Sequence, residues 1–177
     1  SVYHQGSYFY ALENGNGCRN FRLVRLPAGT SNIESFANAE EVFAYNDHRF
    51  IDYLAPFKDY IALFVREEGL PKIMIMDPSN NENFFYVSFP DATYDVYMAE
   101  NREYENDLLR ITYSSFITPE TTYDYDMKNK TFIQRKQKEV KGFNRDLYTT
   151  ERINVTARDG VSVPLSMVYK KREEQTD

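Results

Sequence analysis

Tryptophan is absent from this sequence, and its 177 residues include a single cysteine, Cys18. One cysteine excludes an internal disulfide framework and fits a reducing compartment. No apolar run approaches the roughly 18 residues that a membrane-spanning helix needs, and no secretory signal peptide opens the chain. We therefore expect a cytoplasmic protein that does not bind a membrane.

The chain also has fewer basic than acidic residues. The chain has 21 Lys and Arg against 27 Asp and Glu, which gives a formal net charge of −6, and its pI is near 5.1. This balance excludes general nucleic-acid binding through a basic face. The two histidines, His4 and His48, lie far from each other in sequence, and His48 lies far from Cys18, so no metal site and no cofactor are predicted.

Aromatic residues, by contrast, are abundant, with 15 Tyr and 13 Phe. Aromatic and β-branched side chains suit a pleated, half-buried sheet surface. Helical patterns are nearly absent, while short runs of strand-forming residues follow one another, separated by turn residues. The sequence predicts an all-β protein.

A repeat organises these runs. Three predicted hairpins start at Tyr8, Tyr60 and Leu108, a period of about 50 residues. Further strand candidates flank them, at Glu41–Tyr45, Phe50–Leu54, Phe84–Phe89, Thr93–Ala99 and Thr131–Gln134. A hairpin with two more strands, repeated at this spacing, is typical of β-propeller blades. A β-sandwich has strands at similar intervals and remains the alternative, although the period favours the propeller.

The last part of the chain departs from this repeat. After Gln137 the strand pattern gives way to a polar stretch that reaches Thr150. Two further runs, Arg152–Thr156 and Val161–Tyr169, flank an Asp-Gly pair, Asp159 and Gly160. Asp-Gly between strands predicts a type I′ turn, in which both central residues have positive φ. This terminal hairpin breaks the blade spacing, which indicates the start of a different unit.

Two segments carry a family resemblance: Tyr113–Pro119, with the sequence Tyr-Ser-Ser-Phe-Ile-Thr-Pro, and Thr149–Tyr169, with its Ala-Arg-Asp-Gly turn and Ser-Met-Val-Tyr end. The first resembles the last propeller blade of oligopeptidase B, in the prolyl oligopeptidase family of serine peptidases. The second resembles the start of that enzyme's hydrolase domain. The resemblance implies about three blades of a partial propeller in residues 1–136, an interdomain linker or hinge in 137–150, and the first, truncated hairpin of an α/β-hydrolase domain in 151–177.

The resemblance also implies a function. A peptidase of this type cleaves short peptides after Arg or Lys, and its propeller gates and filters the substrate. The implied partners of this chain are the remaining propeller blades and the hydrolase domain of the parent protein, with short basic peptides as substrate of the full enzyme. Within the linker, Lys141, Gly142, Phe143 and Asn144 are candidate hinge residues, because a glycine can absorb a backbone rotation. A passive connector is an equally open interpretation.

The resemblance implies no catalytic residue in this chain. The family's nucleophile sits in a Gly-x-Ser-x-Gly motif and is followed by an Asp and a His. No serine here stands in such a motif, and His4 and His48 both precede the hydrolase segment. We expect the chain alone to be inactive, with no catalytic, cofactor-binding or metal-binding residue. Two alternatives stay open: a freestanding propeller-like module that binds a protein partner, and part of a proline-specific oligopeptidase.

Overall fold

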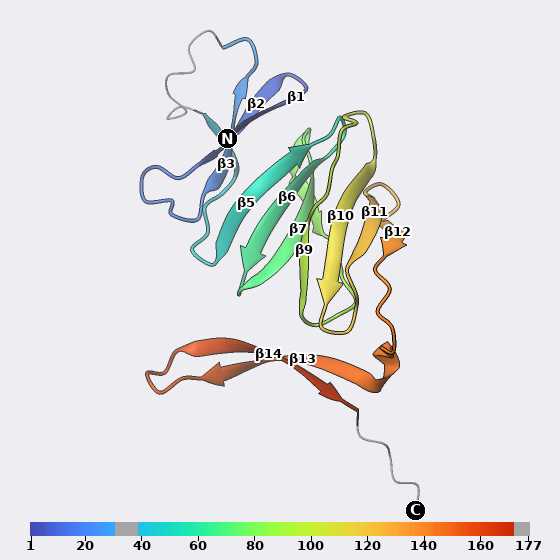
Figure 1. The fold of residues 1–177 in the computed structure, drawn as a ribbon. Helices are drawn as coiled ribbons and strands as arrows, with labels where there is room; N and C mark the ends of the chain where they lie inside the picture. The colour runs from blue at the N-terminus through green and yellow to red at the C-terminus, as the bar shows by residue number, and fades with distance from the viewer. Residues whose placement is uncertain (31–38, 172–177) are drawn as a thin grey trace, which may run out of the picture.

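A computed structural model describes residues 1–30 and 39–171 of the protein. In these residues it contains three antiparallel sheets of four strands and one hairpin of two strands. The three sheets stand side by side like blades of a fan, and the hairpin crosses beneath them (Figure 1).

Each four-stranded sheet is a meander, because its strands lie in the order in which the chain makes them. Blade 1 consists of β1 (Val2–Gln5), β2 (Tyr8–Glu13), β3 (Arg22–Pro27) and β4 (Glu40–Phe43). Blade 2 consists of β5 (Arg49–Pro56), β6 (Ile61–Glu67), β7 (Leu70–Asp77) and β8 (Asn80–Tyr86). Blade 3 consists of β9 (Tyr94–Met98), β10 (Leu108–Ser115), β11 (Thr121–Asp126) and β12 (Thr131–Gln137). A short 3₁₀ helix, η2 (Arg145–Leu147), then leads into the terminal hairpin of β13 (Tyr148–Thr156) and β14 (Ser162–Lys170).

The architecture confirms the all-β fold class and the partial propeller of three blades. The three predicted hairpins are the central strand pairs β2–β3, β6–β7 and β10–β11. A two-sheet sandwich is wrong, because each hairpin belongs to its own four-stranded sheet. Strand β1 has no counterpart among the predicted strands. Residues 172–177 of the predicted hydrolase segment lie outside the described residues.

Blade 2 is buried on both faces. Leu63 and Val65 of β6 belong to a core shared with blade 1, whereas Ala62 and Phe64 belong to a core shared with blade 3. Successive side chains of a strand point to opposite faces, so a strand covered on both sides must be apolar throughout. This explains why β6 shows an unbroken apolar run where strands of other blades alternate.

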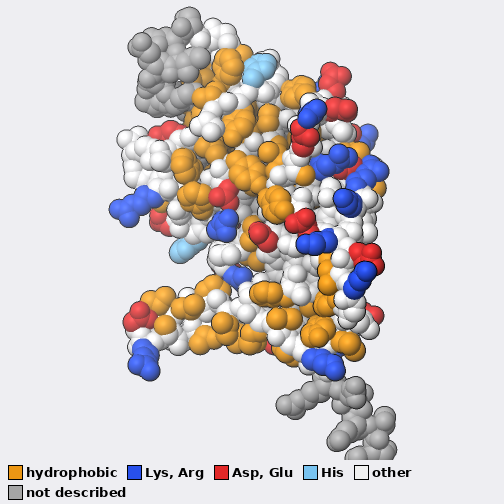
Figure 2. Space-filling model, in the orientation of Figure 1, with side chains coloured by type: hydrophobic (Ala, Val, Ile, Leu, Met, Phe, Trp, Pro, Cys, Tyr) orange, Lys and Arg blue, Asp and Glu red, His pale blue; other side chains and the backbone are white. Residues whose placement is uncertain are grey.

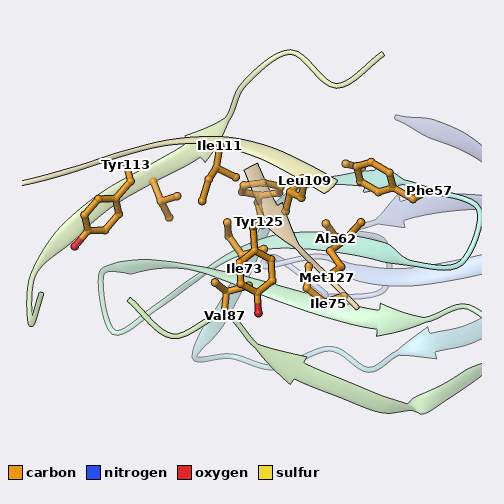
Figure 3. Close-up of a cluster of buried hydrophobic side chains, with 13 residues drawn as sticks. Phe57, Ala62, Ile73, Ile75, Val87, Leu109, Ile111, Tyr113, Tyr125 and Met127 are labelled. Atoms are coloured by element: carbon orange, nitrogen blue, oxygen red, sulfur yellow. The ribbon is translucent and has the colours of Figure 1, made fainter. Parts of the chain in front are cut away.

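The core between blades 2 and 3 is rich in aromatic and branched side chains (Figure 3). Leu109, Ile111 and Tyr113 of β10 point across to Ile73 and Ile75 of β7, and all five are buried. Arg110 and Thr112 lie between them on β10 and point the other way; Arg110 is exposed and Thr112 is half-buried. Blade 3 therefore presents its apolar face to blade 2 and keeps a polar face on the opposite side.

The turn predicted at Asp159 and Gly160 has a different backbone geometry from the one expected, whereas the turn between β6 and β7 has that geometry. Positive φ occurs at both Glu68 (51°) and Gly69 (73°) in the two-residue loop between β6 and β7, as in a type I′ turn. At the predicted type I′ site only Gly160 has positive φ, 84°. The amide of Gly160 donates to the carbonyl of Ala157 (3.0 Å), so Asp159 lies inside a type I turn that Gly160 follows in left-handed conformation. The expectation fails because the loop from Ala157 to Val161 has five residues rather than two.

We predict that Gly160→Val destabilises the terminal hairpin by about 1–3 kcal/mol, the cost of holding a non-glycine residue in a strained conformation. A side chain at Gly160 would meet no atom within 4 Å, so the effect is one of backbone strain and not of collision. Hydrogen exchange of the β13 and β14 amides measures it, since exchange reports local opening.

Gly160→Asn is the matched control, because asparagine tolerates left-handed backbone better than valine. Its amides should exchange at rates between those of the wild type and Gly160→Val. Equal protection in all three proteins would show that the turn does not require a positive φ.

Candidate functional site

The candidate site is the junction at which the chain leaves blade 3 and enters the terminal hairpin. The amide of Lys138 donates to the carbonyl of Glu120 (2.8 Å), which holds the start of the linker to blade 3. The chain then turns at Gly142, whose φ is 74°. Asn144 caps η2 by accepting from the amide of Asp146 (3.0 Å), and the ring of Phe143 stacks on that of Tyr148 at 5.8 Å.

An ion pair fixes this linker to blade 3. Arg145 of η2 donates from Nη2 to Oδ1 of Asp91, at a distance of 2.8 Å. Asp91 lies in the loop between β8 and β9. The Asp91 side chain is only 2% exposed. Its other oxygen, Oδ2, accepts from the hydroxyls of Tyr113 and Thr118, both at 2.7 Å. Asp91 thus joins the end of β10, the following turn and the linker at one buried carboxylate.

The carboxylate stays ionised in this position. Burial works against its charged form, but the hydrogen bonds from Tyr113 and Thr118 and the charge of Arg145 outweigh burial and lower the pKa of Asp91 below its usual range. Burial and the hydrogen bond to Asp91 raise the pKa of Tyr113, so its phenol remains a donor. Tyr113 and Thr118 both belong to the Tyr-Ser-Ser-Phe-Ile-Thr-Pro segment, which therefore has a structural role in holding Asp91.

The terminal hairpin turns its polar face toward the blades. Arg152 of β13 donates from Nη2 to the carbonyl of Glu68, in the type I′ turn of blade 2. Ser166 of β14 hydrogen bonds through its hydroxyl to that of Thr93 (2.9 Å), next to blade 3. Arg152 and Ser166 are directly opposed in the hairpin and so lie on the same face.

The type I′ turn that receives Arg152 is itself held by a charged network. Glu67, the last residue of β6, accepts from Arg49 (2.6 Å), Lys72 (2.9 Å) and Tyr86 (2.8 Å). Burial alone would raise the pKa of Glu67, but these three hydrogen bonds lower it to about 2. All four strands of blade 2 are thereby joined at the end that meets the hairpin.

The opposite face of the hairpin is apolar. Its apolar side chains come from alternate positions of both strands and are 41–46% exposed. Ile153 pairs with Leu165 and Val155 with Val163 across the hairpin, and Tyr169 lies on the same face at the end of β14. Figure 2 shows hydrophobic side chains along the hairpin at the bottom of the view. Thr149 and Glu151 share this face, and a mostly apolar exposed face of this kind is typical of a surface that contacts other protein.

The junction contains no arrangement suited to covalent catalysis. His4 lies on β1 against the ring of Phe9 (5.3 Å), while His48 lies in the exposed loop before β5. Ser114 and Ser115 end β10.

Among the described residues no group of three or more His, Cys, Asp or Glu side chains is placed to bind a metal. The described part of the chain also has no helix that is both long and apolar enough to span a bilayer.

Of the predicted hinge residues, Lys141 and Gly142 are exposed and Asn144 forms the cap of η2. The structure brings none of the four to Asp91. Arg145, the residue that makes this contact, follows them directly and was not predicted, nor was Asp91. The sequence gives no signal for the pair, because 54 residues separate them.

Consecutive four-stranded meanders that share cores face to face define a β-propeller architecture. Residues 1–138 match the family model for the prolyl oligopeptidase N-terminal β-propeller domain. The chain belongs to the prolyl oligopeptidase family.

Individual relatives agree with this assignment. Dipeptidyl aminopeptidase BI of Pseudoxanthomonas mexicana is 28% identical over 169 residues, which are 95% of this chain and 23% of the relative. Oligopeptidase B from Leishmania major has a TM-score of 0.80 and 27% identity, over 99% of this chain and 25% of that structure. Oligopeptidase B from Trypanosoma brucei, in a closed form with bound antipain, has a TM-score of 0.81 at 24% identity, over 99% of this chain and 25% of that structure, which supports the fold alone. The chain spans about a quarter of the length of these proteins.

We predict that Arg145→Gln loosens the linker and speeds trypsin cleavage after Lys138 and Lys141 roughly tenfold. A hydrogen bond to a charged group contributes about 1.5–3 kcal/mol, and every 1.4 kcal/mol corresponds to a factor of ten. Time courses of limited proteolysis, resolved by mass spectrometry, measure the two cleavage rates.

Arg158→Gln is the matched control for this experiment. Arg158 is exposed in the turn of the hairpin, and its replacement removes one trypsin site just as Arg145→Gln does. Cleavage of the linker at the same rate in both variants would contradict the anchoring role of the Asp91–Arg145 pair.

Proposed function

We propose that this chain is the gating propeller region and interdomain junction of a peptidase of the oligopeptidase B type, which cleaves short peptides after Arg or Lys. In this proposal residues 1–136 form propeller blades, 137–150 the linker and 151–177 the first hairpin of an α/β-hydrolase domain. The chain supplies no catalytic residue.

The observation that carries the proposal is the two-faced terminal hairpin. Arg152 and Ser166 attach its polar face to blades 2 and 3, and the apolar face formed by Ile153, Val155 and Leu165 points away from them. An apolar sheet face of this kind is typically covered by helices or by another sheet. A hydrolase domain that continues from β14 would cover it and would lie across the same end of the blades.

The gating role is supported by how the junction is attached. The linker has one buried anchor, the Asp91–Arg145 ion pair, and beside it Gly142 provides a backbone position with φ of 74°. A glycine beside a buried anchor is a suitable pivot between two domains, because hinges concentrate rotation in a few residues of a loop. Opening about this pivot would admit short peptides and exclude large folded proteins.

The assignment to the oligopeptidase B type, on which the proposed specificity for basic residues rests, is supported by the relatives. The structure from Leishmania major is named oligopeptidase B and is 27% identical, whereas the prolyl endopeptidase structures among the similar folds are 16% identical. The closer similarity favours the B type over a proline-specific enzyme.

We predict that the 177-residue chain alone does not hydrolyse a fluorogenic Arg-Arg peptide and that a serine-reactive probe labels none of its serines. Neither Ser114 nor Ser115 has a histidine base among its hydrogen-bond partners. The whole protein that contains this region should cleave after Arg and Lys and leave Pro-containing peptides intact. Fluorescence release, compared with a heat-treated sample, measures both.

Three results would contradict parts of this proposal. Turnover by the chain alone would mean that it holds its own active site. Cleavage after Pro in the whole protein would assign it to the proline-specific type. A whole protein that lacks peptidase activity and binds a protein partner through its loops would identify a freestanding binding module.

A further inference from the structure

A cavity of about 610 Å³ lies between blades 1 and 2, at the end of the blades that is opposite to the terminal hairpin. The hairpin meets blade 2 at the turn between β6 and β7, whereas the cavity is lined at the β1–β2, β5–β6 and β7–β8 turns. These turns lie at the other end of the strands, because consecutive strands of each meander are antiparallel (Figure 1). The volume lies within the range of pockets that bind small ligands.

The cavity lies apart from the surfaces that the proposed function assigns to other parts of a larger protein. Further blades would pack on the faces of blades 1 and 3 that point away from blade 2, and a hydrolase domain would lie at the hairpin end. The cavity is formed between two blades of this chain and at the opposite end. It therefore coincides with neither of these interfaces.

Aromatic rings form much of the cavity wall. Tyr8 of blade 1 and Tyr60 and Phe85 of blade 2 line it, and all three are half-buried. Two of these rings already attract a cation: the guanidinium carbon of Arg25 is 4.4 Å from the centre of the Tyr8 ring, and Nζ of Lys130 is 4.1 Å from that of Phe85. Since the face of an aromatic ring attracts positive charge, these walls are suited to a cationic ligand.

Gln5 adds a buried amide to the cavity lining. Its side chain is 5% exposed, and its Nε2 donates to the carbonyls of Phe57 (3.2 Å) and Lys58 (2.7 Å) in the β5–β6 turn. These two bonds use both hydrogens of the amide and fix the side chain, while Oε1 accepts no hydrogen bond from the described residues. A largely buried acceptor without a partner favours a ligand that donates hydrogen bonds.

Two carboxylates also line the cavity. Asp59 is exposed in the β5–β6 turn, and Asp77 is half-buried at the end of β7. The hydroxyl of Ser79 donates to Asp77 (2.6 Å) and lowers the pKa of Asp77, so this carboxylate stays ionised. Lys58 is part of the lining as well, but its ammonium group pairs with Glu105 at 3.6 Å. The cavity therefore has an excess of negative charge.

The environment of Tyr60 reflects this charge. Burial raises the pKa of Tyr60, and the charges of four surrounding aspartates raise it further: Asp107, Asp59, Asp126 and Asp77. Asp107 and Asp126 belong to blade 3, so this blade adds to the negative potential at the cavity wall. A potential of this sign attracts cations from solution.

We propose that this cavity binds a guanidinium group, the charged end of an arginine side chain. A guanidinium has five donors and no acceptor, which matches the carboxylates and Oε1 of Gln5, and its planar shape stacks on aromatic rings. The ammonium group of lysine is a compact point charge without a planar face and fits these walls less well. The inference concerns the end of the blades away from the junction and does not depend on the proposed peptidase activity.

Titration of the 177-residue chain with N-acetyl-arginine amide, followed by NMR of the backbone amides, tests the proposal. We expect saturable shifts at Asp59, Tyr60 and Ser79. N-acetyl-citrulline amide has the same shape without the charge and should cause no such shifts, while N-acetyl-lysine amide should bind roughly tenfold more weakly. Free arginine is titrated in parallel. Saturable binding of either arginine compound supports the guanidinium site, and the tighter of the two identifies a peptide or the free amino acid as the source.

Asp59→Asn should weaken the binding of N-acetyl-arginine amide roughly tenfold, because it removes a charged acceptor. Asp59 is exposed, and an unchanged unfolding midpoint confirms that the variant folds. Asp159→Asn is the matched control: it makes the same substitution at an exposed position in the hairpin turn and should leave the affinity unchanged. The proposal is overturned if no saturable shifts occur at these amides, if the citrulline or lysine compound binds as tightly, or if Asp59→Asn retains the wild-type affinity.

Discussion

The structure depends on the burial of blade 2 from both sides. Its two central strands are apolar at consecutive positions, such as Leu63 and Phe64, and these residues belong to two different cores. A sheet of this kind exposes a large apolar surface unless another sheet covers each face. Blades 1 and 3 supply the two covers. The face of blade 3 that points away from blade 2 is accordingly polar, and on it Arg110 and Arg135 pair with Asp124.

The position of the terminal hairpin follows from that stack. Packing of blade 3 on blade 2 brings the loop that carries Asp91 to the end of β10, where Tyr113 and Thr118 donate to it. The free oxygen of Asp91 then holds Arg145, and the linker delivers the hairpin to the ends of blades 2 and 3. One buried carboxylate thus relates the propeller region to the segment that follows it. The apolar face left on the hairpin is the observation on which the proposal of a covering hydrolase domain rests.

Local patterns predicted most of this fold, and long-range contacts account for what they missed. The hairpins that begin at Tyr60 and Leu108 were predictable because their strands and turn residues are adjacent in sequence. Strand β1 was missed because its four residues are placed by pairing with β2 rather than by a pattern of their own. The turn at Gly160 was assigned to the wrong type because dipeptide preference does not specify loop length. The Asp91–Arg145 pair had no local signal at all, since folding alone brings these residues together.

The central claim is that the polar face of the hairpin docks on the blades, and a designed disulfide tests it most directly. The hydroxyls of Thr93 and Ser166 are 2.9 Å apart. In a Cys18→Ser background, the double variant Thr93→Cys with Ser166→Cys replaces these hydroxyls by two thiols that lie close enough to form a disulfide. The account predicts nearly complete cross-linking of the native chain under mild oxidation and little in the unfolded chain. Equal, low cross-linking in both would show that the hairpin does not lie against the blades.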